Sequence, residues 1–539
     1  MPGCGVPAWR RQENWTGKEQ EGGSGMNRLE KMRVYDVIVV GGGNAALCAA
    51  ISAAEQGAQV LLLERSPIEE RGGNSTYTDG KFRAVYNGVE DIRALVPDLT
   101  DAEVANSDFG AYTEEDFFDD MARITQYRTE PDLCEILVRN SRDILFWLKQ
   151  NGVRLMPNYG RQAYKVDGRF KFWGGTTLVV ASGGPGLVDA LYKTAEAKGV
   201  EIHYQAWVRD LIYEAGMGVS GVIVALDGEL HHVRARSVVL ACGSFEANAE
   251  WRAKYLGPGW DLAKVRGSKY NTGDGLAMAL KIGAQSFGHW SGCHATAWER
   301  YASEFGDMAT TPQYQRHSYT FGIVVNSEGK RFVDEGADFR NYTYAKYGHE
   351  VLKQPGQVAW QIYDGKVLHL LTDEYRTRHV TKARADTLDG LIAQLDEIDG
   401  NQLRETIREF NAAVLVDVPF DPNTKDGRAA PGLPVPRSNW ANTIDTPPFE
   451  AYAVTCGITF SFGGVRINNE GQVLDTGQMP IPGLFAAGEM VGGIFYFNYP
   501  GASGLTSGAV FGRLAGRHAA RAAIAARGEG DDRERARAG

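Results

Sequence analysis

The sequence predicts an α/β fold in which one sheet-based domain is assembled from N- and C-terminal segments, with a second, α+β domain inserted between them. Three observations support this prediction. Residues 35–64 read as a strand, a glycine-rich turn, a helix and a second strand. A buried strand far along the chain ends on Cys242-Gly243-Ser244. A third strand, near the C-terminus, runs into Gly488-Glu489. We expect these distant strands to lie in one sheet.

The first segment, YDVIVVGGGNAALCAAISAAEQGAQVLLLE, carries the most specific motif. Residues 37–40 form a short apolar run of the kind buried in a parallel sheet. The following G-x-G-x-x-A turn allows a tight bend, close approach of a pyrophosphate, and packing of helix on strand. Glu64 ends the next strand, where an acid binds a ribose hydroxyl pair. The segment predicts a Rossmann-like dinucleotide site, to which we assign Gly41, Gly43, Asn44, Ala45, Ala46 and Glu64.

A polar loop containing two glycines follows the second strand. Its backbone N–H groups and polar side chains are suited to bind a phosphate or the edge of a planar cofactor. A plain surface loop is the alternative, but the neighbouring dinucleotide turn favours contact with the cofactor. We therefore add to the site Arg71, Gly72, Gly73, Asn74 and Ser75.

The next part of the chain alternates between helical and strand patterns. Residues ~90–150 and 187–198 predict helices. A glycine cluster at 182–186 follows no apolar strand, so we do not interpret it as a second dinucleotide turn. Residues 201–211 predict a strand, 221–225 and 231–235 a hairpin, and 237–241 a buried strand. From these strands we assign Val208 and Gly243 to the cofactor site.

A change of composition marks the inserted domain. Residues 289–460 contain more aromatic, His and Arg residues, a hairpin pattern over 323–332, helical patterns over 388–395 and 402–414, and a Pro- and Asn-rich loop over 424–448. We interpret 289–460 as a cap domain between the two parts of the cofactor domain, 34–288 and 461–525. We expect residues 1–33 and 526–539 to be a disordered leader and tail.

The closing segment returns to the first pattern. A strand from Ile481 ends at Gly488-Glu489, and the sequence YPGASG precedes a helix over 505–525. A helix N-terminus offers N–H groups and a positive dipole end, which suit the electron-rich pyrimidine edge of a reduced flavin. A glycine-rich turn without a ligand is the alternative. To this end of the site we assign Gly488, Glu489, Ser503, Gly504 and Leu505.

The composition of the chain argues against several classes of protein, namely nucleic-acid-binding, membrane-spanning and metal-binding proteins. The 539 residues are 43% apolar and 23% charged, as is ordinary for a globular protein of two or more domains. The net charge of −10 argues against nucleic acid as the main partner. No apolar run reaches the ~20 residues that span a bilayer, and we expect a cytoplasmic location. The cysteines lack the close spacing of zinc or iron–sulfur sites, so we expect no metal: Cys4, Cys48, Cys134, Cys242, Cys293 and Cys456.

Residues 41–46, 64, 71–75, 241–244, 488–489 and 499–505 together resemble the fumarate reductase/succinate dehydrogenase flavoprotein superfamily. Within it, GGGNAALCAA, DEGADFRNYTYAKYG and FYFNYPGASGLTSGAVFGRLAG look most like the tricarballylate dehydrogenase group, and the match runs over about residues 34–525. The resemblance implies FAD, with a cap domain over the isoalloxazine and the substrate between them. Asn74-Ser75-Thr76 lacks the histidine that anchors flavin covalently in membrane-complex members, so we expect non-covalent FAD.

The resemblance also implies site residues. In that family, histidines and two arginines hold the substrate's carboxylates and supply a proton. His294 matches the first of these histidines. Arg340 corresponds to the family's catalytic arginine, but it lies one position further along the chain than the family's motif would place it. The family's His-His pair reads Thr459-Phe460 here, and its Asn-Arg-Leu-Gly-Gly segment reads NYPGA, which makes fumarate a poor candidate. We expect Arg340, His294 and Tyr499 to have catalytic roles, and Arg316 and His317 to bind the substrate. The alternative is that these residues have structural roles. For Arg316 and His317 the structural role is the stronger interpretation.

The implied reaction is desaturation of a C–C bond next to a carboxylate, tricarballylate to cis-aconitate, by hydride transfer to flavin and proton abstraction by an arginine. Arginine binds both oxygens of a carboxylate, but its ordinary pKa, above ~12, makes it a difficult base. Two alternatives stay open. Tyr499-Pro500-Gly501 resembles enone-forming 3-ketosteroid dehydrogenases, and the chain also fits a flavoprotein electron-relay subunit. The expected partners are a small polycarboxylate and a separate, membrane-associated iron–sulfur electron acceptor.

Overall fold

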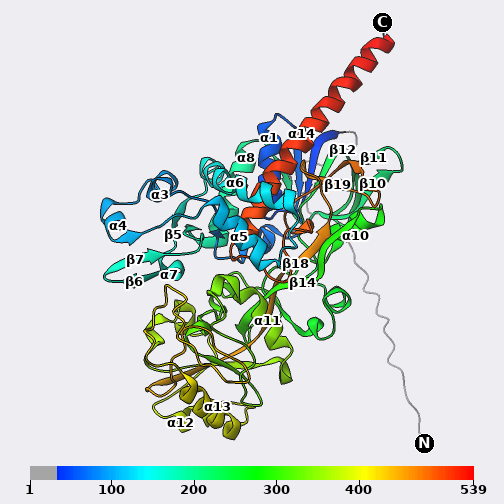
Figure 1. Cartoon of the computed structure of the whole chain (residues 1–539). Helices are drawn as coiled ribbons and strands as arrows, with labels where there is room; N and C mark the ends of the chain where they lie inside the picture. The colour runs from blue at the N-terminus through cyan, green and yellow to red at the C-terminus, as the bar shows by residue number, and fades with distance from the viewer. Residues whose placement is uncertain (1–32, 539) are drawn as a thin grey trace, which may run out of the picture.

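The computed structural model describes residues 33–538, and a mixed sheet organises its first and last parts (Figure 1). Strand β1 (Val34–Val40) pairs in parallel with β2 (Val60–Leu63) on one side and with β12 (Glu229–Leu240) on the other. Strand β20 (Pro480–Ala486) pairs in parallel with the end of β12. The prediction that distant segments share one sheet is therefore confirmed. The sheet is completed by β9 (Glu201–His203), β10 (Trp207–Glu214), β11 (Gly218–Leu226) and β19 (Gln472–Leu474).

Two helices from opposite ends of the chain pack against each other beside this sheet. Helix α1 (Asn44–Glu55) follows β1, and α14 (Ser503–Ala538) closes the chain (Figure 1). A Cβ at Gly512 would lie 2.4 Å from the Ala45 carbonyl oxygen, and one at Gly516 would lie 2.1 Å from that of Ala49. The glycines therefore permit a close helix crossing, which brings the N-termini of both helices to the same region.

The closing helix differs from the prediction in its length. The sequence predicted a helix over 505–525 and a disordered tail from 526, whereas the helix of the structure continues to Ala538. Alanine and arginine, which dominate this stretch, are strong helix formers. The predicted leader lies outside the described residues, apart from Arg33.

The segment between β2 and β9 is mainly helical, as predicted. Thr100 and Thr113 start two of its helices with capping boxes, each accepting the N–H three residues on. Two small sheets, β3-β8-β5 and β4-β7-β6, complete the segment. Its elements are α2 (Gly73–Thr76), β3 (Lys81–Phe82), α3 (Val89–Leu95), α4 (Asp101–Ala105), β4 (Ser107–Asp108), α5 (Glu114–Ile124), α6 (Pro131–Gln150), β5 (Leu155–Pro157), α7 (Tyr159–Gln162), β6 (Ala163–Val166), β7 (Arg169–Phe172), β8 (Leu178–Val180) and α8 (Gly183–Ala197).

A second, six-stranded sheet belongs to the middle of the chain. Its longest strands, β14 (Ser286–Glu299) and β18 (Phe449–Val465), pair antiparallel and lie between the first sheet and the lower lobe of Figure 1. Both strands cross the boundaries predicted for the cap. The other elements are α9 (Ala249–Trp251), β13 (Lys264–Val265), α10 (Asp274–Lys281), β15 (Ile323–Asn326), α11 (Tyr344–Leu352), β16 (Ala359–Tyr363), β17 (Lys382–Ala385), α12 (Leu388–Ile392) and α13 (Gly400–Ala413).

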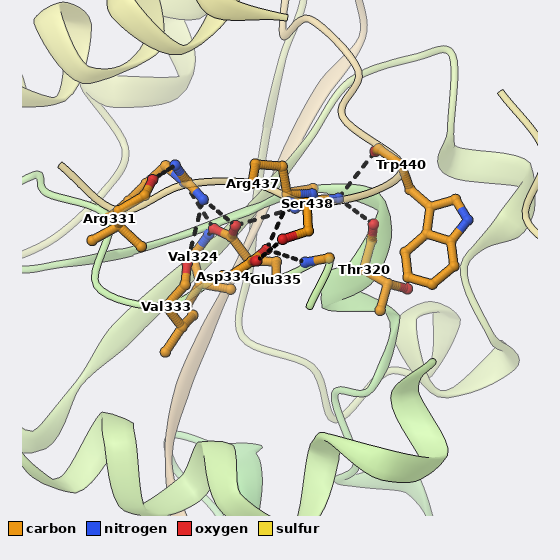
Figure 2. Close-up of polar contacts among 12 residues, drawn as sticks. Thr320, Val324, Arg331, Val333, Asp334, Glu335, Arg437, Ser438 and Trp440 are labelled. Atoms are coloured by element: carbon orange, nitrogen blue, oxygen red, sulfur yellow. Dashed lines mark hydrogen bonds and ion pairs between the residues drawn. The ribbon is translucent and has the colours of Figure 1, made fainter. Parts of the chain in front are cut away.

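The hairpin predicted over 323–332 is present only as a tight turn, in which the Asn326 N–H donates to the Lys330 carbonyl at 3.0 Å, because the main partner of β15 is β16; a buried ion network follows the turn. Only one bridge, between Val325 and Arg331, follows β15. The Arg331 guanidinium instead lies 2.5 Å from the Glu335 carboxylate, which also contacts Arg437 at 3.2 Å (Figure 2). Arg437 donates further hydrogen bonds to backbone carbonyls, among them that of Gly322. The network therefore ties the 331–335 turn to the long loop that precedes β18.

Among residues 33–538, no helix combines the length and the hydrophobicity that a bilayer crossing requires. Within the same part of the chain, His, Cys, Asp and Glu side chains form no group of three or more arranged to hold a metal ion.

Candidate functional site

A first cavity of ≈ 130 Å³ lies at the carboxyl ends of the parallel strands, and we name it the turn cavity. The β1–α1 turn, the end of β2, the start of β10 and the turn after β12 all contribute to its wall. Of the predicted cofactor residues, it is lined by Gly41, Gly43, Asn44, Ala45, Glu64, Gly73, Asn74, Ser75, Val208, Gly243 and Glu489.

The shape of this turn fits a dinucleotide. Gly41 has φ +109°, and a Cβ there would lie 2.5 Å from the Ala241 carbonyl oxygen at the end of β12. The residue before α1, Gly43, has no side chain to cap the helix, and although the Ser75 hydroxyl accepts the Asn44 N–H at 3.0 Å, the positive end of the helix dipole still favours an anion in the turn cavity. Glu64 is buried at the end of β2 and accepts the Ser66 N–H at 2.8 Å. Burial raises the pKa of the Glu64 carboxyl above its ordinary value.

Four predicted cofactor residues lie close to the two cavities without lining either of them. Arg71 points elsewhere: it donates to the Tyr204 hydroxyl at 2.9 Å and pairs with Asp189. The prediction that Arg71 contacts the cofactor is therefore wrong, because local sequence does not tell where a long side chain is directed. Gly72 has a φ of +101°, a backbone conformation that glycine adopts most easily and that the loop requires at this point. Ala46 and Ser503 are fully buried packing residues.

A second cavity, of ≈ 220 Å³, adjoins the first, since both are lined by Asn44, Ala45, Asn74, Ser75 and Glu489. We name it the aromatic cavity. The N-terminus of α14 forms one wall through Gly504 and Leu505, and Gly488 also contributes. Strands β14 and β18 and the 340–344 segment form another. Its aromatic lining consists of His294, His317, Tyr344, Phe460, Phe462, Phe495 and Tyr499.

Two arginines line the aromatic cavity, Arg266 and Arg340, and both are buried. Arg266 donates to the Thr459 hydroxyl at 3.3 Å, and its Nε has no hydrogen-bond partner. Neither guanidinium forms an ion pair with a carboxylate of residues 33–538. The acids Asp79, Glu374 and Glu489 also line the cavity, but a buried guanidinium without a paired carboxylate is costly, so the arrangement is suited to an anionic ligand. Arg266 was missed by sequence reasoning because it follows a two-residue strand in no recognisable motif.

The ring of His294 is enclosed by aromatic rings. It stacks on Phe460 at 5.2 Å and meets Tyr344 and Tyr499 edge-on. Neither ring nitrogen of His294 has a hydrogen-bond partner within the described chain. Burial, with a smaller effect from Arg266, lowers the pKa of His294 well below its ordinary value. His294 is therefore neutral near pH 7 and offers one donor and one acceptor to a ligand.

Tyr499 is paired with a second tyrosine. Its hydroxyl lies 2.5 Å from the Tyr344 hydroxyl, and both side chains line the aromatic cavity. Burial raises the pKa of both phenols, so both are protonated at neutral pH. Tyr344 lies in the DEGADFRNYTYAKYG segment used for the family resemblance, but no sequence signal placed it opposite Tyr499.

The two predicted substrate-binding residues have different positions. His317 lines the aromatic cavity, with its ring 4.7 Å from that of Tyr344. Arg316 does not: it is fully buried and lies 2.8 Å from the Glu299 carboxylate. The structure does not bring Arg316 to the cavity as predicted, because the buried Glu299 carboxylate binds its guanidinium.

Replacing Gly41 by alanine is expected to abolish tight FAD binding. The new Cβ would overlap the Ala241 carbonyl, in addition to about 1–3 kcal/mol of strain from the positive φ. Visible absorbance of the purified variant measures bound flavin. Gly57→Ala is the matched control, because Gly57 also has a positive φ, +83°, but a Cβ there would meet no atom within 4 Å. Equal flavin content in the two variants would contradict the assignment of the turn.

Comparisons with known proteins agree with this geometry. A family model described as FAD binding domain matches residues 36–505. A probable fumarate reductase of Shewanella frigidimarina is 29% identical over 497 residues, which cover 90% of this chain and 75% of that protein. The structure of the open conformation of a flavocytochrome c3 fumarate reductase superposes with a TM-score of 0.68 at 27% identity, covering 92% of this chain and 79% of the other. A 3-ketosteroid delta1-dehydrogenase from Sterolibacterium denitrificans also gives a TM-score of 0.68, at 21% identity, with coverage of 90% and 99%; that likeness concerns the fold.

Proposed function

Because the chain belongs to the family of this FAD binding domain, in the fumarate reductase/succinate dehydrogenase flavoprotein superfamily, it is an FAD-dependent oxidoreductase, and we propose that it acts on a C–C bond next to a carboxylate. One observation carries the proposal: Arg266 and Arg340 line one cavity and have no carboxylate partner within residues 33–538. A substrate carboxylate supplies the missing charge and accepts two hydrogen bonds from a guanidinium.

Different side chains of the aromatic cavity have different proposed roles toward such a substrate. Bound FAD supplies two-electron chemistry by accepting or giving a hydride. Arg340 is the proposed proton carrier, and Arg266 the proposed carboxylate ligand. His294, whose neutral ring has no hydrogen-bond partner among the described residues, orients the substrate as donor or acceptor. The aromatic rings exclude water from the reacting bond, which strengthens each of these electrostatic contacts.

The finer proposal is that tricarballylate is oxidised to cis-aconitate with non-covalent FAD. It is supported by the three segments that resemble the tricarballylate dehydrogenase group and by the two unpaired arginines. Thr459 and Phe460, at the place of the superfamily's His-His pair, both line the aromatic cavity, which disfavours fumarate itself.

A specific observation favours a second candidate, an enone-forming dehydrogenase of the ketosteroid type. The Tyr344 and Tyr499 hydroxyls lie 2.5 Å apart in the same cavity. Such a pair can polarise a ketone oxygen by hydrogen bonding or relay a proton. In that case the apolar rings would contact an extended hydrocarbon skeleton.

Anaerobic titration of the oxidised holoenzyme separates the candidates. We expect tricarballylate to bleach the flavin absorbance and a 3-ketosteroid to leave it unchanged, with succinate as the dicarboxylate comparison. Bleaching by the ketosteroid alone would favour the second candidate. Bleaching by none of them would contradict both and favour a flavoprotein that relays electrons within a larger assembly.

We also propose that a separate iron–sulfur protein at the membrane accepts the electrons, and that this chain itself works in the cytoplasm. The support is the scattered arrangement of the cysteines: the five that the structure describes are all free thiols. Reoxidation of the substrate-reduced enzyme by candidate carriers, followed by flavin absorbance, tests this partner.

A further inference from the structure

Glu489 lies where the turn cavity meets the aromatic cavity and lines both of them. It belongs to the turn after β20, and its carboxyl oxygen Oε1 accepts the Ser461 N–H at 2.8 Å. A cofactor that extends from one cavity into the other passes this carboxyl group. Its charge therefore matters for binding of FAD, whose pyrophosphate is anionic.

Glu246 lines neither cavity, but its side chain interacts with that of Glu489. It is fully buried, and its Oε1 accepts hydrogen bonds from the side-chain amides of Asn74 at 2.5 Å and Asn271 at 2.6 Å. Its Oε2 is buried and receives no hydrogen bond from an N–H donor or hydroxyl of the described chain. The group that faces it is the Glu489 carboxyl, and the two side chains form a hydrogen bond.

Two carboxyl groups can form a hydrogen bond with each other only if one of them carries a proton. Two buried carboxylates in contact would repel each other strongly, as in other acid pairs that share a proton. The nearby Arg252 guanidinium attracts Glu246 through space and weakens this repulsion, but it forms no ion pair with either carboxyl in the described chain. Arg252 donates to the backbone carbonyl of Glu246 rather than to its carboxylate, and Cys293 is a neutral thiol. The Glu489 carboxyl also accepts hydrogen bonds from the backbone N–H groups of Ser244 and Ser461.

We propose that Glu246 and Glu489 share a single proton, and that Glu246 is a positioning residue that holds Glu489 as a neutral acid beside the FAD. The pair then carries one negative charge instead of two. That charge lies on Glu246, which lines neither cavity, and is stabilised by the side-chain amides of Asn74 and Asn271, two residues that do line the turn cavity. Glu489 is left able to donate a hydrogen bond to an oxygen of the cofactor. The proposal depends on FAD binding and not on the identity of the substrate.

The direction of the pKa shifts of Glu246 and Glu489 determines how the stability of the folded protein depends on pH. Burial raises the pKa of both carboxyls, and for Glu489 the neighbouring Glu246 adds to the rise. The folded protein thus holds a proton that the unfolded chain loses near pH 4–5. Folding stability from this pair is complete below that pH, and it falls as pH rises toward the pKa of the folded pair.

Glu246→Gln tests the proposal without any enzyme assay. The glutamine places a permanent N–H donor where the shared proton lies and keeps an oxygen for the two asparagines. Thermal unfolding of the FAD-free protein is measured from about pH 5 to about pH 8. We expect the melting temperature of the variant, relative to the unmodified protein, to rise steadily across this range. Glu250→Gln, an exposed acid four residues on, is the control and should show no such trend. A constant loss of stability at every pH would overturn the proposal.

Two further measurements cover the case in which the variant fails to fold. Infrared spectra of the unmodified protein at neutral pH should contain the C=O band of a buried protonated carboxyl, and Glu489→Gln should remove it. The dissociation constant of FAD should increase as pH rises, up to about tenfold per pH unit above the pKa of the pair. Absence of the band together with a pH-independent FAD affinity would show that no proton is shared.

Discussion

Replacing Arg340 by lysine is expected to reduce substrate-dependent bleaching of the flavin by about two to four orders of magnitude, with FAD still bound. Lysine keeps the positive charge but offers a compact ammonium in place of a planar fork with five donors. The backbone cannot move to compensate. Asp338, two residues before, lies 2.5 Å from the Arg123 guanidinium, and Tyr342, two residues after, donates to Asp120 at 2.7 Å.

Anaerobic stopped-flow absorbance with a saturating carboxylate substrate measures this effect, and the visible spectrum gives the flavin content of the same sample. Arg408→Lys is the control, because Arg408 is exposed on α13 and pairs only with the neighbouring Glu405. A bleaching rate near that of the unmodified enzyme would remove Arg340 from the site. It would also direct attention to Arg266 as the proton carrier.

Replacing Glu335 by glutamine is expected to lower the free energy of unfolding by about 3–5 kcal/mol. Glu335 is fully buried between Arg331 and Arg437 and accepts the Val324 N–H at 2.7 Å (Figure 2). The substitution leaves two arginines without their shared counter-ion. It thereby loosens the turn that precedes the Arg340 segment, so some loss of activity should accompany the loss of stability.

Chemical denaturation monitored by tryptophan fluorescence measures the change, with the exposed Glu328→Gln as control. The pH dependence provides a second check. Burial opposes ionisation of Glu335, but the two arginines outweigh it and hold the pKa of the carboxyl below its ordinary value. Its stabilising contribution is therefore present above about pH 4–5 and is lost on acidification. A variant as stable as the unmodified protein at pH 7 would contradict this account.

The sequence predicted several residues that the structure brings together on the two cavities, and these belong to stretches that depend on local pattern. The residues of the β1–α1 turn, Glu64 at the end of β2, and the glycines at the start of α14 all lie on the two cavities. In these stretches the backbone itself forms the site. A glycine with a positive φ or a helix start preceded by glycine can be predicted from neighbouring residues alone.

Predictions about long side chains were less successful. Arg71 and Arg316 were assigned to the site because of their position in the chain, and both point into ion pairs elsewhere. Arg266 was not considered, yet it lines the aromatic cavity. The direction of an arginine depends on which carboxylates and rings the fold brings within reach, and several of these lie hundreds of residues away.

The sequence by itself determined the cofactor class, the α/β fold and the return of the C-terminal segment to the first sheet, because strand, turn and helix patterns are local. Only the tertiary structure brought Glu246 against Glu489 and Tyr344 against Tyr499. Each pair joins residues more than one hundred positions apart in the chain. The first contact follows from the pairing of β12 with β20, which precede Glu246 and Glu489, and the second depends on α11, which begins at Tyr344 and packs on β14; no single segment encodes these arrangements.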